Sequence, residues 1–142
     1  MGKPLPRVVI DTNVLMVSIS RRSALYWLYA AFLEGKFLLC VTNEIMTEYA
    51  EIMTRHMGAD FCDTVLDLIQ SAPNTRLISP TYRFNLLLDP DDNKFVDCAI
   101  VANAVCIVSH DRDFRVLQTI DFPKVNVVDT RQFQELLLGI GA

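Results

Sequence analysis

The chain has 142 residues and a formal net charge of −4, and 51% of its residues are hydrophobic. This length and composition fit one domain, residues 1–142, with a covered core, and they exclude a disordered chain. The acidic balance argues against a surface that is basic throughout, as a nonspecific nucleic-acid binder would need.

Strand and helix signals alternate along the chain. Short runs of β-branched residues predict strands, and apolar residues at helical spacing between caps and breakers predict helices. In chain order we expect a strand over 7–10, a helix over 23–34, a strand over 37–41, helices over 42–56 and 60–70, a brief extended piece at 77–78, a helix over 89–103, a strand over 105–108, a short helix over 112–118, a strand over 125–128 and a helix over 130–138. This alternation predicts an α/β fold whose central parallel sheet has about four to five strands, with helices on both faces.

Two aspartates lie just past the ends of predicted strands. Asp11 comes after the apolar residues 8–10, and Asp111 repeats this placement after 105–108. The carboxyl ends of parallel strands meet at one rim of the sheet, where open α/β sheets bind their ligands. Carboxylates gathered there would repel one another, and a hard divalent cation such as Mg²⁺ or Mn²⁺ explains them most simply. Taken alone, Asp11 could equally serve as a turn residue or a helix cap.

Three further acids fall within predicted helices. Glu48 borders the apolar stripe of its helix and can reach into a crevice, although a surface position is the alternative. Asp97 lies in a helix that is apolar nearly all round, where a buried carboxylate is costly unless it binds a metal or a partner such as an arginine. Asp92 falls at the start of the same helix, and capping is the simpler explanation there.

The remaining features concern phosphate binding and cellular location. Four arginines are close in sequence to the strand ends and could favour phosphate locally, or they could be ordinary surface residues; they are Arg21, Arg22, Arg112 and Arg115. The four cysteines form no CxxC pair and predict reduced core thiols rather than a zinc site. No apolar run reaches a membrane span of ~20 residues, and the first residues lack a secretory signal, so we expect a cytoplasmic protein.

Four acidic blocks in this order resemble the PIN-domain nucleases, in particular the bacterial VapC-like toxins of toxin-antitoxin pairs. The matching blocks are Val8-Val9-Ile10-Asp11-Thr12-Asn13-Val14, Thr42-Asn43-Glu44-Ile45 through Glu48-Tyr49, Asp89-Pro90-Asp91-Asp92-Asn93-Lys94-Phe95 with Asp97, and Val108-Ser109-His110-Asp111-Arg112-Asp113-Phe114. Ser109 departs from the threonine that is common in relatives but keeps the hydroxyl group.

The resemblance implies a PIN-like fold over nearly the whole chain and a set of functional residues. The implied catalytic acids are Asp11, Glu48, Asp97 and Asp111, with Asp92 as a competing or additional metal ligand and with Asn13, Ser109 and Asp113 in supporting roles. The choice between Asp92 and Asp97 stays open.

The implied activity is hydrolysis of single-stranded RNA with Mg²⁺ or Mn²⁺, and the four arginines would contact the RNA. A small antitoxin and a second copy of the chain are the implied protein partners. Two alternatives are a non-catalytic PIN-like binding module and a receiver-like phosphoacceptor domain. A receiver usually opens with a pair of acids, whereas Asp11 stands alone before Thr12 and Asn13.

Overall fold

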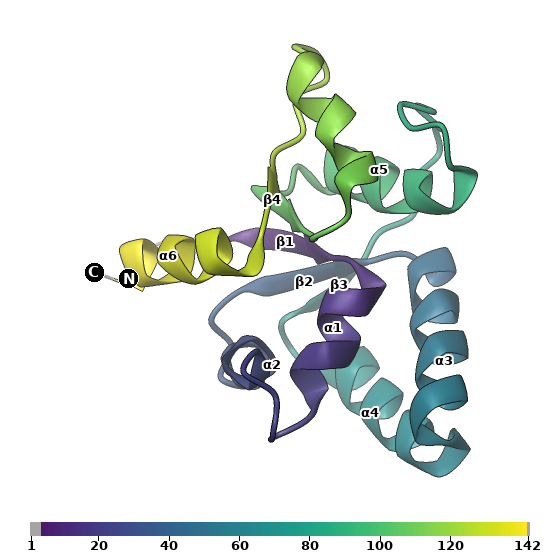
Figure 1. Cartoon of the computed structure of the whole chain (residues 1–142), viewed down its shortest axis with the longest axis vertical. Coiled ribbons are helices and arrows are strands. Elements are labelled where there is room, and N and C mark those ends of the chain that lie inside the picture. Colours follow the sequence, from purple (N-terminus) through teal and green to yellow (C-terminus); the bar gives the residue numbers. More distant parts are fainter. Residues whose placement is uncertain (1–3, 142) are drawn as a thin grey trace.

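Five parallel strands form one sheet in the order β3-β2-β1-β4-β5 (Figure 1). The computed structural model describes residues 4–141, with the backbone alone for residues 140 and 141. The strands are β1 (Arg7–Ile10), β2 (Leu38–Val41), β3 (Thr75–Leu77), β4 (Cys106–Val108) and β5 (Val127–Val128). This order differs from the 2-1-3-4-5 order of receiver domains, which removes the receiver-like alternative. Residues 1–3, part of the segment expected to lack a secretory signal, lie outside the described residues.

Helices cover both faces of the sheet. They are α1 (Thr12–Ile19), α2 (Tyr26–Leu33), α3 (Asn43–Met57), α4 (Ala59–Ser71), α5 (Pro90–Ala102), the 3₁₀ helix η1 (Arg112–Thr119) and α6 (Thr130–Gly141). Figure 1 shows α5 and η1 on one side of the sheet and α1, α2 and α4 on the other. Phe133 of α6 packs against Trp27 of α2, with ring centroids 6.1 Å apart, so α6 joins the α2 side. The predicted α/β class with a parallel sheet is confirmed.

The helix α1 is absent from the sequence prediction. Six of its eight residues are buried, because it packs against both α2 and α3. A helix buried on most sides shows no polar face, and so it lacks the 3.6-residue periodicity by which surface helices are recognised. Asp11 stands at its N-cap position without a capping side-chain hydrogen bond, which leaves the carboxylate available for other contacts.

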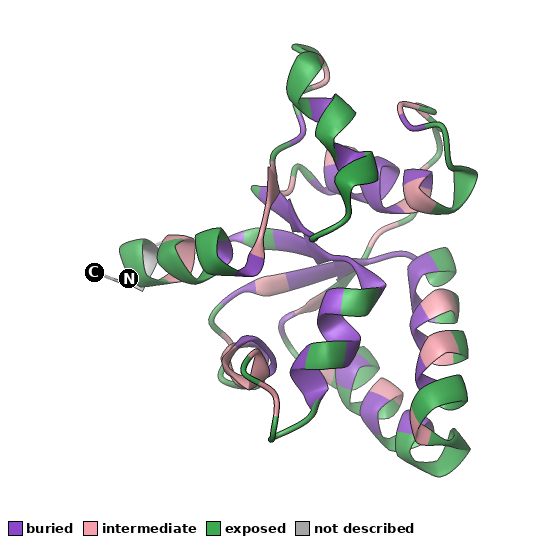
Figure 2. Cartoon of the chain, viewed as in Figure 1, coloured by how far each residue is buried: buried purple, intermediate pink, exposed green. Residues whose placement is uncertain are grey.

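The central strands are the most deeply buried part of the molecule. Val8, Val9 and Ile10 of β1 have no exposed surface, and Figure 2 shows the buried residues gathered on the strands and on the inner helix faces. All four cysteines are buried and free, as predicted. Within the described part of the chain, no helix combines the length and apolarity needed to cross a membrane.

Candidate functional site

The ends of β1 and β4 bring two predicted acids together. These strands are neighbours with Ile10 opposite Val108, and the backbone N–H of Asp11 donates to the carbonyl oxygen of Val108 at 3.0 Å. The hydroxyl of Ser109 then donates to Oδ2 of Asp11 at 2.8 Å and accepts from the backbone N–H of Asp111 at 3.0 Å. Ser109 therefore ties the strand-tip residues Asp11 and Asp111 into one structure.

A buried tyrosine fixes the helix that carries Glu48. The hydroxyl of Tyr49 donates to the carbonyl oxygen of Ile10 at 2.5 Å, which fastens α3 to the end of β1. Glu48, the preceding residue, accepts a hydrogen bond from the Thr12 hydroxyl on Oε2. Its other oxygen, Oε1, lies 2.8 Å from Nζ of Lys94. Glu48 thus reaches the same edge of the sheet as Asp11.

Asp92 faces the strand-tip acids from the first turn of α5. Its pKa is raised to about 6, mainly by desolvation and in addition by the charges of Asp89, Asp111, Asp11 and Asp113. Oδ2 of Asp92 is buried and finds no hydrogen-bond partner among the described residues. A buried carboxylate oxygen without a donor is costly, and a cation would satisfy it.

Carboxylate oxygens of Asp89, Asp92 and Asp113 all lie within 4.8 Å of one another, close enough to hold one metal ion. Asp92 therefore belongs to this group and also feels the charges of the strand-tip acids Asp11 and Asp111. Burial also raises the pKa of Asp11, and Asp111 and Glu48 add to the rise, while the Ser109 hydrogen bond opposes it. The arrangement concentrates negative charge that a divalent cation would neutralise.

The structure gives Asp97 a different environment. Its side chain is buried, with 4% of the residue exposed, and Oδ1 accepts a hydrogen bond from the backbone N–H of Phe84 at 3.1 Å. Burial raises the pKa of Asp97, and the nearby charges that modify it belong to Arg83 and Glu44. Asp97 thus contacts the loop before α5, whereas Asp92 faces the strand-tip acids.

Two small hollows flank the strand-tip acids and share His110 and Asp111 in their walls. One, of about 260 Å³, is lined also by Arg112 and Arg115 of η1. The other, of about 280 Å³, is lined by Asp11, Asn13 and three apolar residues, Val14, Val17 and Leu25. The strand-tip acids therefore border both a hollow that contains arginines and a hollow that is largely apolar.

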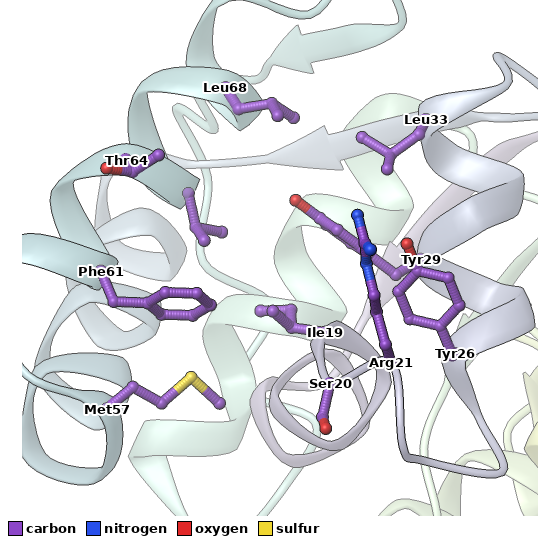
Figure 3. Close-up of a pocket in the computed structure, with 11 residues that line it drawn as sticks. Ile19, Ser20, Arg21, Tyr26, Tyr29, Leu33, Met57, Phe61, Thr64 and Leu68 are labelled. Atoms are coloured by element: carbon purple, nitrogen blue, oxygen red, sulfur yellow. The ribbon is translucent and has the colours of Figure 1, made fainter.

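The other two predicted arginines lie elsewhere. Helix α1 spans roughly 12 Å at 1.5 Å per residue, so it carries Arg21 and Arg22 away from Asp11. Arg21 lines an apolar hollow of about 720 Å³ between α2 and α4, together with Tyr26, Tyr29 and Phe61 (Figure 3). All four arginines were expected near the acids because they are close to the strand ends in sequence. Helix α1, which was not predicted, separates Arg21 and Arg22 from the acids.

Sequence reasoning missed Thr12 and Lys94 as parts of the site. Thr12 belongs to the first matching block, but a threonine after a strand carries no distinctive signal. Lys94 falls near the start of a predicted helix, where an exposed lysine is ordinary. Only the packing of α5 against α3 shows that its ammonium group turns toward Glu48.

The family model of the PIN domain matches residues 7–113. A search of curated proteins found no match.

Similar solved structures include VapBC2 from Rickettsia felis bound to a promoter DNA fragment, with a TM-score of 0.60 and 14% identity over 87% of this chain and 98% of that one. VapBC-1 from nontypeable Haemophilus influenzae has a TM-score of 0.61 and 12% identity over 88% and 98% of the two chains. VapC20 of Mycobacterium tuberculosis, a toxin that cleaves the sarcin-ricin loop, has a TM-score of 0.57 and 12% identity over 76% and 92%.

At such low identity these structures show a shared fold, and the family model supplies the relationship in sequence. It includes the acids of all four blocks, from β1 to Asp113 at the start of η1. The chain belongs to the PIN-domain family.

Proposed function

We propose that this protein is a metal-dependent endoribonuclease that hydrolyses phosphodiester bonds in single-stranded RNA and acts as the toxin of a toxin-antitoxin pair. The observation that carries the proposal is the buried Oδ2 of Asp92, which lacks a hydrogen-bond donor among the described residues and faces the charges of Asp11 and Asp111. Membership of the PIN-domain family supports nuclease activity, and one similar structure is described as a PIN-domain endonuclease, Utp24.

The donor set fits a hard cation. Oxygen ligands suit Mg²⁺ and Mn²⁺, and Asp11, Asp92 and Asp111 offer carboxylates at one edge of the sheet. We propose these three as the metal ligands, with Asp113 and Asp89 as neighbours able to bind directly or through water. Asp97 supports the site through the loop before α5 in this proposal, because its carboxylate already accepts the Phe84 amide.

Such a cation would supply Lewis-acid chemistry, polarising the phosphate and lowering the pKa of an attacking water. The chain's own residues position these groups. Ser109 holds Oδ2 of Asp11 in place by a hydrogen bond of 2.8 Å. The Thr12 hydroxyl fixes Glu48 beside Asp11. No covalent nucleophile is needed, because water attacks phosphorus and the 3′ or 5′ oxygen leaves.

Arg112 and Arg115 are the proposed RNA contacts, since they line the hollow that Asp111 borders. Removing both as Arg112→Ala/Arg115→Ala should weaken RNA binding and flatten its dependence on salt, because each phosphate contact releases counterions. The matched pair Arg21→Ala/Arg22→Ala removes the same charge at the far end of α1 and should have a smaller effect. Fluorescence anisotropy with labelled single-stranded RNA over a salt series measures both.

The protein partners are also part of the proposal. Similar structures are VapBC assemblies, and on that basis we propose a small antitoxin that masks the acidic edge with a basic side chain. A homodimer in the cytoplasm is proposed for the free toxin, and light scattering of the purified chain tests the dimer. Co-expression with the product of a neighbouring gene tests the antitoxin: growth arrest by the chain alone should be relieved.

Cleavage of single-stranded RNA in the presence of Mn²⁺ or Mg²⁺ tests the central claim. Asp11→Asn should abolish cleavage while leaving the fold intact by circular dichroism. Asp63→Asn, an exposed carboxylate on α4, should retain full activity. Equal cleavage by Asp11→Asn and the native chain would refute the assignment, and Mn²⁺ binding without any cleavage would favour the non-catalytic binding module.

A further inference from the structure

Lys94 directs its charged group into the protein. Its side chain is only 11% exposed, and Nζ lies 2.8 Å from Oε1 of Glu48 and donates to the carbonyl oxygen of Asp91 at 2.6 Å. Lysines normally bury their methylene stem and keep the ammonium group in water. Burying the ammonium group is unfavourable unless a partner compensates for the lost hydration. The partner of Lys94 is Glu48, an acid of the candidate site.

Glu48 is held on both of its oxygens. The Thr12 hydroxyl donates to Oε2 and the Lys94 ammonium occupies Oε1. Thr12 is buried and directly follows Asp11, so Glu48 is clamped beside the first acid of the site. A carboxylate with two protein donors is a poorer ligand for a metal ion than one with free oxygens, since the donors take up lone pairs and Lys94 cancels the charge.

Among the described residues, no lysine or arginine forms an ion pair with Asp11, Asp92 or Asp111. Asp92 has a buried oxygen with no donor among the described residues, and the charges acting on it come from aspartates. The acids at this edge of the sheet therefore fall into two groups. The charge of Glu48 is neutralised by Lys94, and the charge of the aspartates remains for a bound cation. This division separates the roles of acids that the sequence presents as equivalent.

We propose that Lys94 is a positioning residue of the nuclease site: it is a built-in counter-cation that competes with the divalent metal for Glu48 and keeps this carboxylate out of direct metal coordination. The inference rests on the proposed metal-dependent function and deepens it. In the native chain Glu48 then orients water or substrate near Asp11, and the metal is held by the aspartates.

Isothermal titration of the full chain with Mn²⁺ tests the proposal without any measurement of activity. Lys94→Met leaves Glu48 charged and free, so the association constant should rise about tenfold, equivalent to about 1.4 kcal/mol. Lys94→Arg keeps the charge and should bind Mn²⁺ like the native chain. Lys36→Met removes the same charge just before β2, at the opposite edge of the sheet, and should leave the constant unchanged because salt screens that distance.

Glu48→Gln completes a double-mutant cycle. In the native background it should weaken Mn²⁺ binding by no more than about threefold, and Lys94→Met/Glu48→Gln should lose the tenfold gain. A loss of tenfold or more in Glu48→Gln alone overturns the proposal, since Glu48 would then be a ligand, and this result does not depend on whether Lys94→Met folds. Unchanged binding in a folded Lys94→Met overturns it as well.

The outcomes separate this inference from the proposed function. If the native chain binds Mn²⁺ and cleaves RNA but Lys94→Met binds equally, only the role of Lys94 fails. If neither protein binds Mn²⁺ at millimolar concentration, the metal-dependent function fails together with it. Binding that appears only in Lys94→Met supports competition between the ammonium and the metal.

Discussion

Replacing Asp92 by Asn should stabilise the metal-free protein and remove its response to Mn²⁺. The native carboxylate is surrounded by other acids and has one buried oxygen without a donor among the described residues. Asn removes the charge and provides an amide N–H for neighbouring carboxylates such as Asp89 and Asp113. The same change deletes a proposed metal ligand, so the effects on stability and on metal binding should have opposite signs.

The size of the effect follows from the pKa. A rise in the pKa of Asp92 from 3.8 to about 6 corresponds to about 3 kcal/mol at 1.36 kcal/mol per pKa unit. Solvent screens this partly exposed group, so we expect a gain of about 1 to 2 kcal/mol in the free energy of unfolding at pH 7.5. The folded state binds the proton of the Asp92 carboxyl group more tightly than the unfolded state does. The loss of stability that Asp92 causes in the native chain therefore grows as the pH rises from 4 to 6. The gain from Asn should therefore vanish near pH 4.

Urea unfolding in EDTA at pH 7.5 and pH 4 measures the stability gained by Asp92→Asn without metal. The same experiment at saturating Mn²⁺ measures the stabilisation by the metal. A metal at 100 times its Kd should stabilise the native chain by about 2.7 kcal/mol, and Asp92→Asn by much less. Asp63→Asn, an exposed change, should stay within about 0.5 kcal/mol under all conditions. A loss of stability in EDTA at pH 7.5, or a full response to Mn²⁺, would refute the reasoning.

Three further variants test the supports of the site. Tyr49→Phe removes the buried hydrogen bond to Ile10 and should cost about 1 to 3 kcal/mol by urea unfolding; a neutral result would show that the hydroxyl does not fasten α3. Ser109→Ala removes a donor that lowers the pKa of Asp11, so the pH midpoint of Mn²⁺ binding by calorimetry should move upward, and Ser109→Thr should restore it. Asp97→Asn should bind Mn²⁺ within about twofold of the native chain, because Oδ1 of Asn still accepts the loop amide; a tenfold loss would return Asp97 to the metal site.

The strand ends could be read from sequence because parallel pairing leaves little choice. Once 7–10 and 105–108 are strands of one parallel sheet, Asp11 and Asp111 must lie at the same edge, and the register of β1 and β4 shows this. Helical phase likewise separated Glu48 from its exposed neighbour Glu44, which pairs with Arg83 on the surface. These inferences needed only local periodicity and the direction of the strands.

Burial alone could not decide between Asp92 and Asp97 as the third metal ligand. The apolar surroundings correctly predicted that Asp97 is buried, yet the partner that explains its burial is the backbone of Phe84, thirteen residues away in a loop without regular structure. Asp92 appeared to be an ordinary helix-start residue, because its neighbours Asp11 and Asp111 approach only through the packing of α5 on β1 and β4. Which buried acid faces which partner depends on that packing, and periodicity carries no information about it.

Asp97 nevertheless supports the site indirectly, through the loop that precedes α5. Its carboxylate holds the amide of Phe84, and the side chain of Asn93 is hydrogen bonded to both the N–H and the carbonyl of Leu87, at 2.9 and 3.1 Å. Together these contacts fix the loop that enters α5, and the first turn of α5 carries Asp92. An acid that binds no metal can therefore still set the position of one that does. Loosening this loop should weaken Mn²⁺ binding only to the extent that Asp92 becomes mobile. Asn93→Ala removes both hydrogen bonds to Leu87, whereas Asp97→Asn keeps the hydrogen bond to Phe84. Asn93→Ala should therefore lower the affinity for Mn²⁺ more than Asp97→Asn does.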